Sequence, residues 1–247
     1  FLCLSCPKAL GQLKHKKVFV TGIFANILRD KYLESHSIVV KNESDTFFFN
    51  LDKSENLNKE YLDRLFDNKH LINEFYSPVS LDELPFPDWG SYVGIYPLRN
   101  NFFSLNEKIA IPLLGTRGCP YSCFNYCTYP LQQGRKVRAR SVENIIDEIK
   151  YWQKTLGTNK FVFRDPVFSI DRKHTIHFCK EVIKQKLNIT FMVETHLNNL
   201  DDEMINLLAT AGLELVYVGI ESANHVVLKD MKRFTIEHDK QYKIIKK

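Results

Sequence analysis

Three of the six cysteines lie within nine residues of one another, at Cys119, Cys123 and Cys127. Thiolate sulfur is a soft ligand that suits zinc and iron–sulfur centres, and clustered cysteines in a chain without a secretory signal are more often metal ligands or catalytic groups than disulfides. On a helix, Cys119 and Cys127 would lie about 12 Å apart along the axis, too far to hold one compact cluster. Gly118 and Pro120 also disfavour a helix. The spacing therefore predicts a loop that wraps around a metal centre.

Three ligands are one fewer than a closed structural zinc site normally uses, whereas a catalytic metal needs an open coordination position. The sequence therefore favours an iron–sulfur cluster with one iron left open. Two alternatives stay open: a partial zinc site completed by a histidine such as His196, and three reduced, buried cysteines without a metal. Among the other cysteines, Cys3 and Cys6 look like half of a ligand set but have no visible partner in the sequence, so we interpret them as structural or incidental, and Cys179 is expected in the core.

Strand-like and helical segments alternate from residue 107 onward and would position this loop. Strands are expected at 108–114, 161–163, 189–193 and 215–220, and helices at 141–155, from 171 for roughly 15 residues, from 200 or 201 to 212, and over the remainder. Ser141 and Asp171 are typical N-caps, and Gly157 is a typical helix end. Repeated strand–helix units indicate a parallel sheet. Their period suits a β/α barrel or an open doubly wound sheet.

The first hundred residues predict a different organisation. Strand-like runs at 17–21 and 37–40, followed by a helical stretch at 58–66, indicate the last part of an α/β domain, which we place at 1–77. A connector at 78–105 follows, because its prolines remove amide donors and restrict the preceding residues. Trp89 is expected to pack this connector onto the next domain, at 106–247. We expect the chain to be a fragment of a longer protein, cut at both ends.

Polar residues follow each predicted strand. In parallel β/α folds, ligands bind at the carboxyl ends of the strands. The cysteine loop follows the first strand, Asp165 the second, Glu194 and His196 the third, and Glu221 the fourth. One such residue means little, but their coincidence on one rim predicts a functional site there.

The cysteine loop resembles that of the radical S-adenosylmethionine (radical SAM) superfamily, in which a three-cysteine loop follows the first barrel strand and an aromatic residue precedes the last cysteine. Here Tyr126 precedes Cys127, and the segments 194–200 and Val218-Gly-Ile-Glu-Ser222 also match. The loop departs from the common spacing, because three residues instead of two separate the last two cysteines. The resemblance implies an α/β fold: a partial (β/α) TIM-like barrel of radical SAM type, preceded by the remnant of a Rossmann-like α/β domain.

The resemblance also implies cofactors and residue roles. A 4Fe-4S cluster would be held by Cys119, Cys123 and Cys127, with S-adenosylmethionine on the open iron and a 5′-deoxyadenosyl radical formed from it. The implied S-adenosylmethionine-binding residues are Tyr126, Glu194, Glu221 and Arg233, and the residues implied to face the substrate are Asp165 and His196. Structural roles are the alternative: ion pairs for the two glutamates, a surface helix position for Arg233, and a turn before Pro166 for Asp165.

The segment 81–89 is similar to the subclass that carries an N-terminal cobalamin-binding domain. This subclass implies methyl transfer or another radical transformation, with cobalamin as a further cofactor. No histidine here lies in the Asp-x-His-x-x-Gly motif of the lower cobalamin ligand, so that motif either precedes Phe1 or is not used. The expected partners are a small-molecule or lipid-like substrate and an electron donor such as flavodoxin or ferredoxin. The alternatives are a methylthiotransferase-like radical SAM enzyme and a non-catalytic zinc-binding α/β protein.

Composition and charge limit the remaining classes of function. The chain of 247 residues is 44% hydrophobic and 26% charged, which excludes intrinsic disorder and collagen-like repeats. No apolar run approaches ~18 residues, so no membrane span is expected. A chain long enough to need no disulfides and without a secretory signal predicts a reducing, cytoplasmic location. The net charge of +5 is spread over many lysines, so nucleic acid is an unlikely partner by this criterion. The basic run 134–140 is either a solvated lead into the next helix or a site for a phosphate or acidic substrate.

Overall fold

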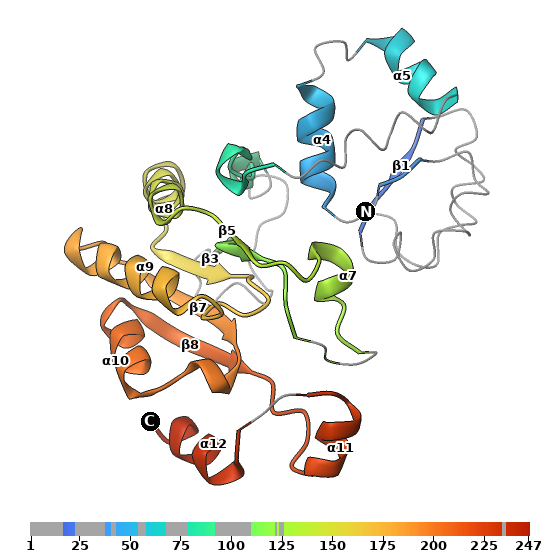
Figure 1. Cartoon of the computed structure of the whole chain (residues 1–247). Helices are drawn as coiled ribbons and strands as arrows, with labels where there is room; N and C mark the ends of the chain where they lie inside the picture. Colours follow the sequence, from blue (N-terminus) through green and yellow to red (C-terminus); the bar gives the residue numbers. More distant parts are fainter. Residues whose placement is uncertain are drawn as a thin grey trace. The chain divides into compact units, whose positions relative to one another are not determined.

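A computed structural model of the chain describes residues 17–22, 38–40, 43–53, 58–67, 79–91, 110–121, 123, 126–233 and 236–247. The Cys3 and Cys6 pair and the proline at 97 lie outside these residues. The chain divides into two compact units, Phe1–Leu84 with Thr128–Gly134, and Pro85–Cys127 with Arg135–Lys247 (Figure 1). The domain limits drawn from the sequence, at 77/78 and 105/106, stay a prediction.

The first unit contains a short parallel strand pair and helices. Strand β1 (Phe19–Val20) pairs with β2 (Ile38–Val39), and the helical elements are α4 (Ser44–Asp52), α5 (Lys59–Asp67), the 3₁₀ helix η3 (Leu81–Glu83) and α7 (Tyr129–Gln133). A small apolar cluster of Ile38, Val40, Phe47, Leu51 and Leu65 joins the strands to α4 and α5. Parallel strands covered by helices confirm the α/β class of this unit.

The second unit is built on a four-stranded parallel sheet in the order β3-β6-β7-β8. The strands are β3 (Ala110–Leu113), β6 (Lys160–Phe163), β7 (Thr190–Thr195) and β8 (Leu213–Val218), and they are connected by α8 (Val142–Leu156), α9 (Arg172–Lys184) and α10 (Asp202–Thr210). This repeated β/α arrangement confirms the fold class predicted from the sequence. No helix of the described ranges is long and apolar enough to cross a membrane.

The helices of this unit begin and end where local signals predict. The Ser141 hydroxyl accepts a hydrogen bond from the Asn144 amide at 3.2 Å, and the Asp171 carboxylate caps α9 in the same way. Gly157 ends α8 in the left-handed conformation, with φ of 64°, which a residue without Cβ adopts at little cost. The predicted helix limits are therefore confirmed to within a few residues.

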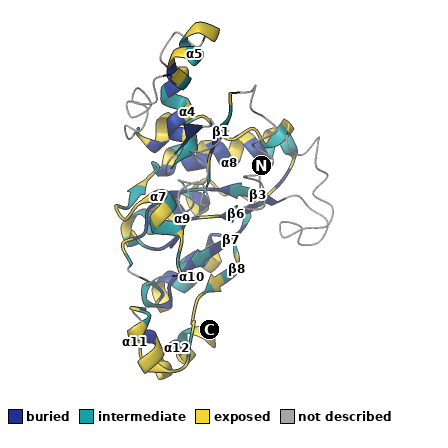
Figure 2. Cartoon of the chain, turned by 90° about the vertical axis from the view of Figure 1, so that its right-hand side faces the viewer, coloured by how far each residue is buried: buried dark blue, intermediate teal, exposed yellow. Residues whose placement is uncertain are grey.

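The core lies between the sheet and its helices. Alternate strand residues such as Ile111, Phe163 and Phe191 are buried against apolar residues of α8, α9 and α10, while Ala110, Val162 and Met192 form a separate cluster on the opposite face. This alternation follows from the two-residue period of a strand. All three connecting helices thus cover the same face of the sheet (Figures 1 and 2), as in a barrel wall.

Two individual predictions about the core are also confirmed. Cys179 is completely buried within α9, and Trp89 packs against the main core cluster together with Phe86. The segment around Trp89 is thereby attached to the second unit by apolar contacts.

The structure differs from the sequence-based expectation at three places. Strand β7 continues through Thr195, so Glu194 lies within the strand and not after it. A short antiparallel pair forms between β4 (Thr116–Arg117) and β5 (Arg138–Ala139), which periodicity cannot predict because its two strands are short and far apart in sequence. The C-terminal segment forms two helices, α11 (His225–Asp230) and α12 (His238–Ile245), interrupted near Lys232, whose φ is 50°.

Candidate functional site

The cysteine loop starts at the carboxyl end of β3, the first strand of the parallel sheet. Cys119 is 5% exposed, Cys123 and Cys127 are half-buried, and all three thiols are free of disulfides. The described loop residues that carry these thiols belong to no helix or strand, which confirms the predicted non-helical loop.

The three thiols share one electrostatic environment. Burial raises the pKa of the Cys119 thiol, and the neighbouring charges of Cys127 and Cys123 raise it further. Within the described ranges, no group of three or more His, Cys, Asp or Glu side chains is already arranged to hold a metal ion. The donor set nevertheless fits an iron–sulfur cluster, because it offers three soft sulfurs from one irregular loop and leaves an open position. The ligand assignment stays a prediction.

Arg233 connects the loop to the end of the fourth strand. Its Nη1 donates to the Cys123 sulfur at 3.4 Å, and its Nη2 donates to the Gly219 carbonyl at 2.7 Å. The same Nη2 lies 3.8 Å from the Glu221 carboxylate, and only 12% of the Arg233 side chain is exposed. A Cβ on Gly219 would overlap the Glu221 carboxylate, so this glycine, which sequence reasoning missed, allows the close approach.

Tyr126 interacts with Cys123 and lies within the electrostatic reach of Arg233. Burial raises the pKa of its phenol to about 12, with a hydrogen bond to Cys123 as the next cause. The structure therefore brings three of the four predicted cofactor-binding residues, Tyr126, Glu221 and Arg233, to the neighbourhood of one cysteine.

The fourth predicted cofactor-binding residue, Glu194, is paired differently. Its carboxylate accepts a hydrogen bond from Arg164 at 2.7 Å, and both side chains are partly exposed. This ion pair joins the carboxyl ends of β6 and β7. The ion-pair alternative for Glu194 is thus observed, and any contact with a cofactor stays a prediction.

His196 supports the loop from the third strand. Its ring centroid lies 5.1 Å from that of Tyr121, and its Nδ1 accepts a hydrogen bond from the Asn198 amide at the start of the 3₁₀ helix η4 (Leu197–Asn199). The Tyr121 hydroxyl in turn donates to Asn199 at 3.4 Å. Since His196 is 4% exposed, it packs beneath the loop, and a role toward substrate stays a prediction.

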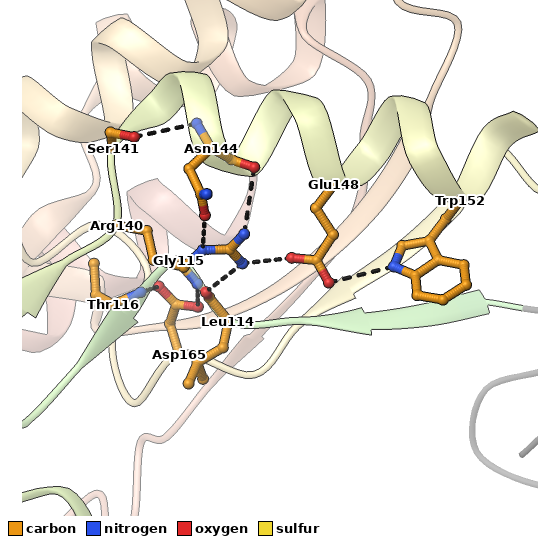
Figure 3. A network of polar contacts seen from close by, with 9 residues as sticks. All are labelled: Leu114, Gly115, Thr116, Arg140, Ser141, Asn144, Glu148, Trp152 and Asp165. Atoms are coloured by element: carbon orange, nitrogen blue, oxygen red, sulfur yellow. Dashed lines mark hydrogen bonds and ion pairs between the residues drawn. The ribbon is translucent and has the colours of Figure 1, made fainter. Parts of the chain in front are cut away.

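Asp165 does not face an open site, in contrast to the role implied by the resemblance. Its side chain is buried, with 1% of its surface exposed. One carboxylate oxygen accepts the Gly115 amide at 2.8 Å, and the other accepts the amide and hydroxyl of Thr116 at 2.7 Å each (Figure 3). The physical reason for the correction is that these contacts direct the carboxylate into the base of the cysteine loop.

Arg140, the last residue of the basic run 134–140, has a structural role. The Arg140 guanidinium donates to Glu148 at 2.5 Å and to the Leu114 carbonyl at 3.2 Å (Figure 3). Glu148 is 1% exposed and also accepts the Trp152 indole N–H at 3.3 Å. Arg140 is therefore engaged within the protein, and the phosphate-binding alternative for the run does not extend to it.

The titration of Asp165 should be visible in the stability of the protein. Burial raises the pKa of Asp165 from 3.8 to about 6, although the bonds from Thr116 and Gly115 oppose the shift. A folded-state pKa above the unfolded one means that the contribution to stability is present below about pH 4 and is lost as the pH rises through 6. Relative to Asp165→Asn, the wild type should lose about 3 kcal/mol of unfolding free energy between pH 4 and 7. Urea unfolding of both proteins checks this. A gain in relative stability over that range would contradict it.

Replacement of Gly118 by alanine should distort the cysteine loop. Gly118 has φ of 90°, and an added Cβ would overlap the Lys136 carbonyl. The dihedral alone costs about 1–2 kcal/mol, and the clash adds to it. Gly212→Ala is a matched control, because its φ is 105° and its Cβ would overlap the Ile189 carbonyl away from the loop. Both variants should unfold at lower urea concentration. Only Gly118→Ala should also increase alkylation of Cys119 in the folded protein, and equal alkylation in the two variants would contradict this prediction.

Comparisons with known proteins agree with this geometry. An anaerobic magnesium-protoporphyrin IX monomethyl ester cyclase of Rubrivivax gelatinosus is 32% identical over 185 residues, which are 71% of this chain and 31% of that protein. A bacteriochlorophyllide d C-12(1)-methyltransferase of Chlorobaculum tepidum is 32% identical over 140 residues, 53% of this chain and 30% of that protein. The chain thus spans about a third of the length of these relatives.

The fold has relatives among solved structures. The structure of the radical S-adenosylmethionine methyltransferase TsrM from Kitasatospora setae, with cobalamin and a 4Fe-4S cluster bound, matches with a TM-score of 0.53. The match covers 97% of this chain and 57% of that one at 14% identity, so it shows the fold alone. The family model described as the radical SAM superfamily matches residues 113–247, more than half of the chain. This match shows that the chain belongs to the radical SAM superfamily.

Proposed function

We propose that this chain carries the cluster-binding and S-adenosylmethionine-binding core of a radical SAM enzyme. The observation that carries the proposal is the cysteine loop at the carboxyl edge of the sheet, with Arg233 in contact with Cys123 and Glu221 beside Arg233. Cys119, Cys123 and Cys127 would hold a 4Fe-4S cluster. When bound, the cluster supplies the electron that cleaves the sulfonium carbon–sulfur bond of S-adenosylmethionine.

The chain's own residues would bind and orient the nucleotide. Arg233 keeps a guanidinium beside the loop, where it matches the carboxylate of the methionine moiety in a forked geometry. The Glu221 carboxylate is an acceptor for the ammonium group or the ribose hydroxyls. The Tyr126 ring, 41% exposed, offers a face on which adenine stacks. At the base of the loop, Asp165 and Thr116 are buried from water.

For the whole protein we propose methyl transfer or another radical transformation of a small-molecule or lipid-like substrate, in the cytoplasm. The names of the Chlorobaculum and Rubrivivax relatives support this class. Cobalamin is a further proposed cofactor, supported by the cobalamin in the TsrM structure. An electron donor such as flavodoxin or ferredoxin would supply the cluster with electrons.

Anaerobic reconstitution with iron and sulfide tests the core of the proposal. We expect about four irons per chain, a broad charge-transfer absorption, and formation of 5′-deoxyadenosine when S-adenosylmethionine and dithionite are added. A chain that binds one zinc ion and no iron would contradict the proposal and would favour a zinc-binding protein.

A further inference from the structure

The base of the cysteine loop is held by side chains in addition to strand pairing. The ladder between β3 and β6 continues as far as the Arg164 amide, which donates to the Leu113 carbonyl at 2.8 Å. Beyond Leu114, the amides of Gly115 and Thr116 donate to the Asp165 carboxylate instead of to the β6 backbone. The Asp165 side chain thus replaces the β6 backbone as the hydrogen-bond acceptor where the chain leaves the sheet.

The carbonyl groups of the same segment are held from the other side. Arg140 donates its backbone amide to the Gly115 carbonyl at 2.9 Å and its Nη1 to the Leu114 carbonyl. Glu148 and Asn144 fix the guanidinium, with the Asn144 side chain accepting from Nε at 2.7 Å. Figure 3 shows Asp165 and Arg140 on either side of the segment 114–116. Both faces of this peptide segment are therefore fixed.

The packing beside Gly115 is tight. A Cβ on Gly115 would lie 3.2 Å from an Asp165 oxygen and 3.3 Å from Ile145 Cδ1, tighter than ordinary van der Waals contact. Cys119 follows Thr116 by three residues, so the direction of the segment 114–116 sets where the first thiol can lie.

We propose that Asp165 and Arg140 are positioning residues that fix the base of the cysteine loop and thereby hold Cys119 in its buried, ligand-ready place. Neither side chain touches the cysteines; they act through the backbone of residues 114–116. The consequence for a cofactor rests on the proposed function. The consequence for the thiols does not, because the contacts that hold the base of the loop are made by protein groups alone.

Alkylation of individual thiols in the metal-free chain tests the proposal. In Asp165→Asn the negative charge is lost, and the side-chain NH2 group faces either the Gly115 amide or the Thr116 amide, so at least one of these hydrogen bonds is lost. We expect the alkylation rate of Cys119, followed by peptide mass mapping under native conditions, to rise about tenfold or more. Cys179, buried in α9, is the internal reporter of global unfolding and should stay unreactive.

Two further sets of variants keep the test informative. Thr116→Val removes one of the three bonds and should give a smaller increase, while Thr116→Ser keeps the hydroxyl and should restore the wild-type rate. Thr175→Val is the matched control, because Thr175 is a buried hydroxyl of α9 that donates to the Asp171 and Phe168 carbonyls, outside the loop. It should leave Cys119 unchanged.

The outcomes separate positioning from general stability. An unchanged Cys119 rate in Asp165→Asn, or a parallel rise at Cys119 and Cys179, would overturn the proposal. Iron content after reconstitution is the second measurement. It should fall in Asp165→Asn and remain at the wild-type level in Thr116→Ser. A wild type that binds no iron would contradict the proposed function, while the thiol rates would still decide the positioning role.

Discussion

Replacement of Cys123 by alanine is expected to abolish iron binding by this chain. A 4Fe-4S cluster with one open iron needs three protein thiolates, and the variant retains two. Cys123 is also the cysteine that Arg233 contacts, so its loss removes the link between the loop and the end of β8. Iron and acid-labile sulfide per chain after anaerobic reconstitution, together with 5′-deoxyadenosine formation, measure the effect. Both should fall to background.

A cysteine outside the loop provides the matched control. Cys179 is completely buried in α9, so Cys179→Ala makes the same chemical change in the core. It should lower stability slightly while iron binding remains. Undiminished 5′-deoxyadenosine production by Cys123→Ala would refute the ligand assignment, and loss of iron in both variants would show that the assay reports folding instead.

The fold was predictable because its signals are local. Ser141 and Asp171 accept hydrogen bonds from amides three residues ahead, and Gly157 adopts a left-handed conformation at the helix end. Such signals depend on a few neighbouring residues. The parallel sheet followed from the repeated β/α units, whereas its strand order did not, because the sequence was compatible with both a barrel and a doubly wound sheet. The β/α pattern also predicted that the cysteine loop lies at the carboxyl end of the first strand of the sheet.

The partners within the site were not predictable in this way. Asp165 lies 50 residues from Gly115, and its place after a strand is equally compatible with a turn, a substrate contact or a loop anchor. Only the distances distinguish these roles. Similarly, Arg140 occurs in a basic run that is compatible with a solvated segment, and Tyr121 has no signal beyond its position between two cysteines. Side-chain pairing across the sheet end is set by tertiary packing, which periodicity does not encode.

The buried ion pair of Arg140 and Glu148 should make a large contribution to the free energy of unfolding. Glu148 is 1% exposed, and Arg140 Nη1 lies 2.5 Å from it with 11% of the Arg140 side chain exposed. Removal of one partner of a buried ion pair leaves an uncompensated charge, which costs about 3–5 kcal/mol. Glu148→Ala should therefore lower the free energy of unfolding by this amount, measured by urea denaturation. The Trp152 indole also loses its acceptor, which adds to the cost.

Two control variants test whether this loss of stability comes from the unpaired charge of Arg140. Glu203 pairs with Arg172 at 2.6 Å on the surface, where both side chains are largely exposed, so Glu203→Ala should cost less than about 1 kcal/mol. The double variant Arg140→Met with Glu148→Leu removes both charges and should recover much of the stability lost in Glu148→Ala. It should not recover the burial of Cys119, because the bond from Arg140 to the Leu114 carbonyl is gone. Equal costs for Glu148→Ala and Glu203→Ala would show that the unpaired Arg140 charge is solvated, and would contradict this prediction.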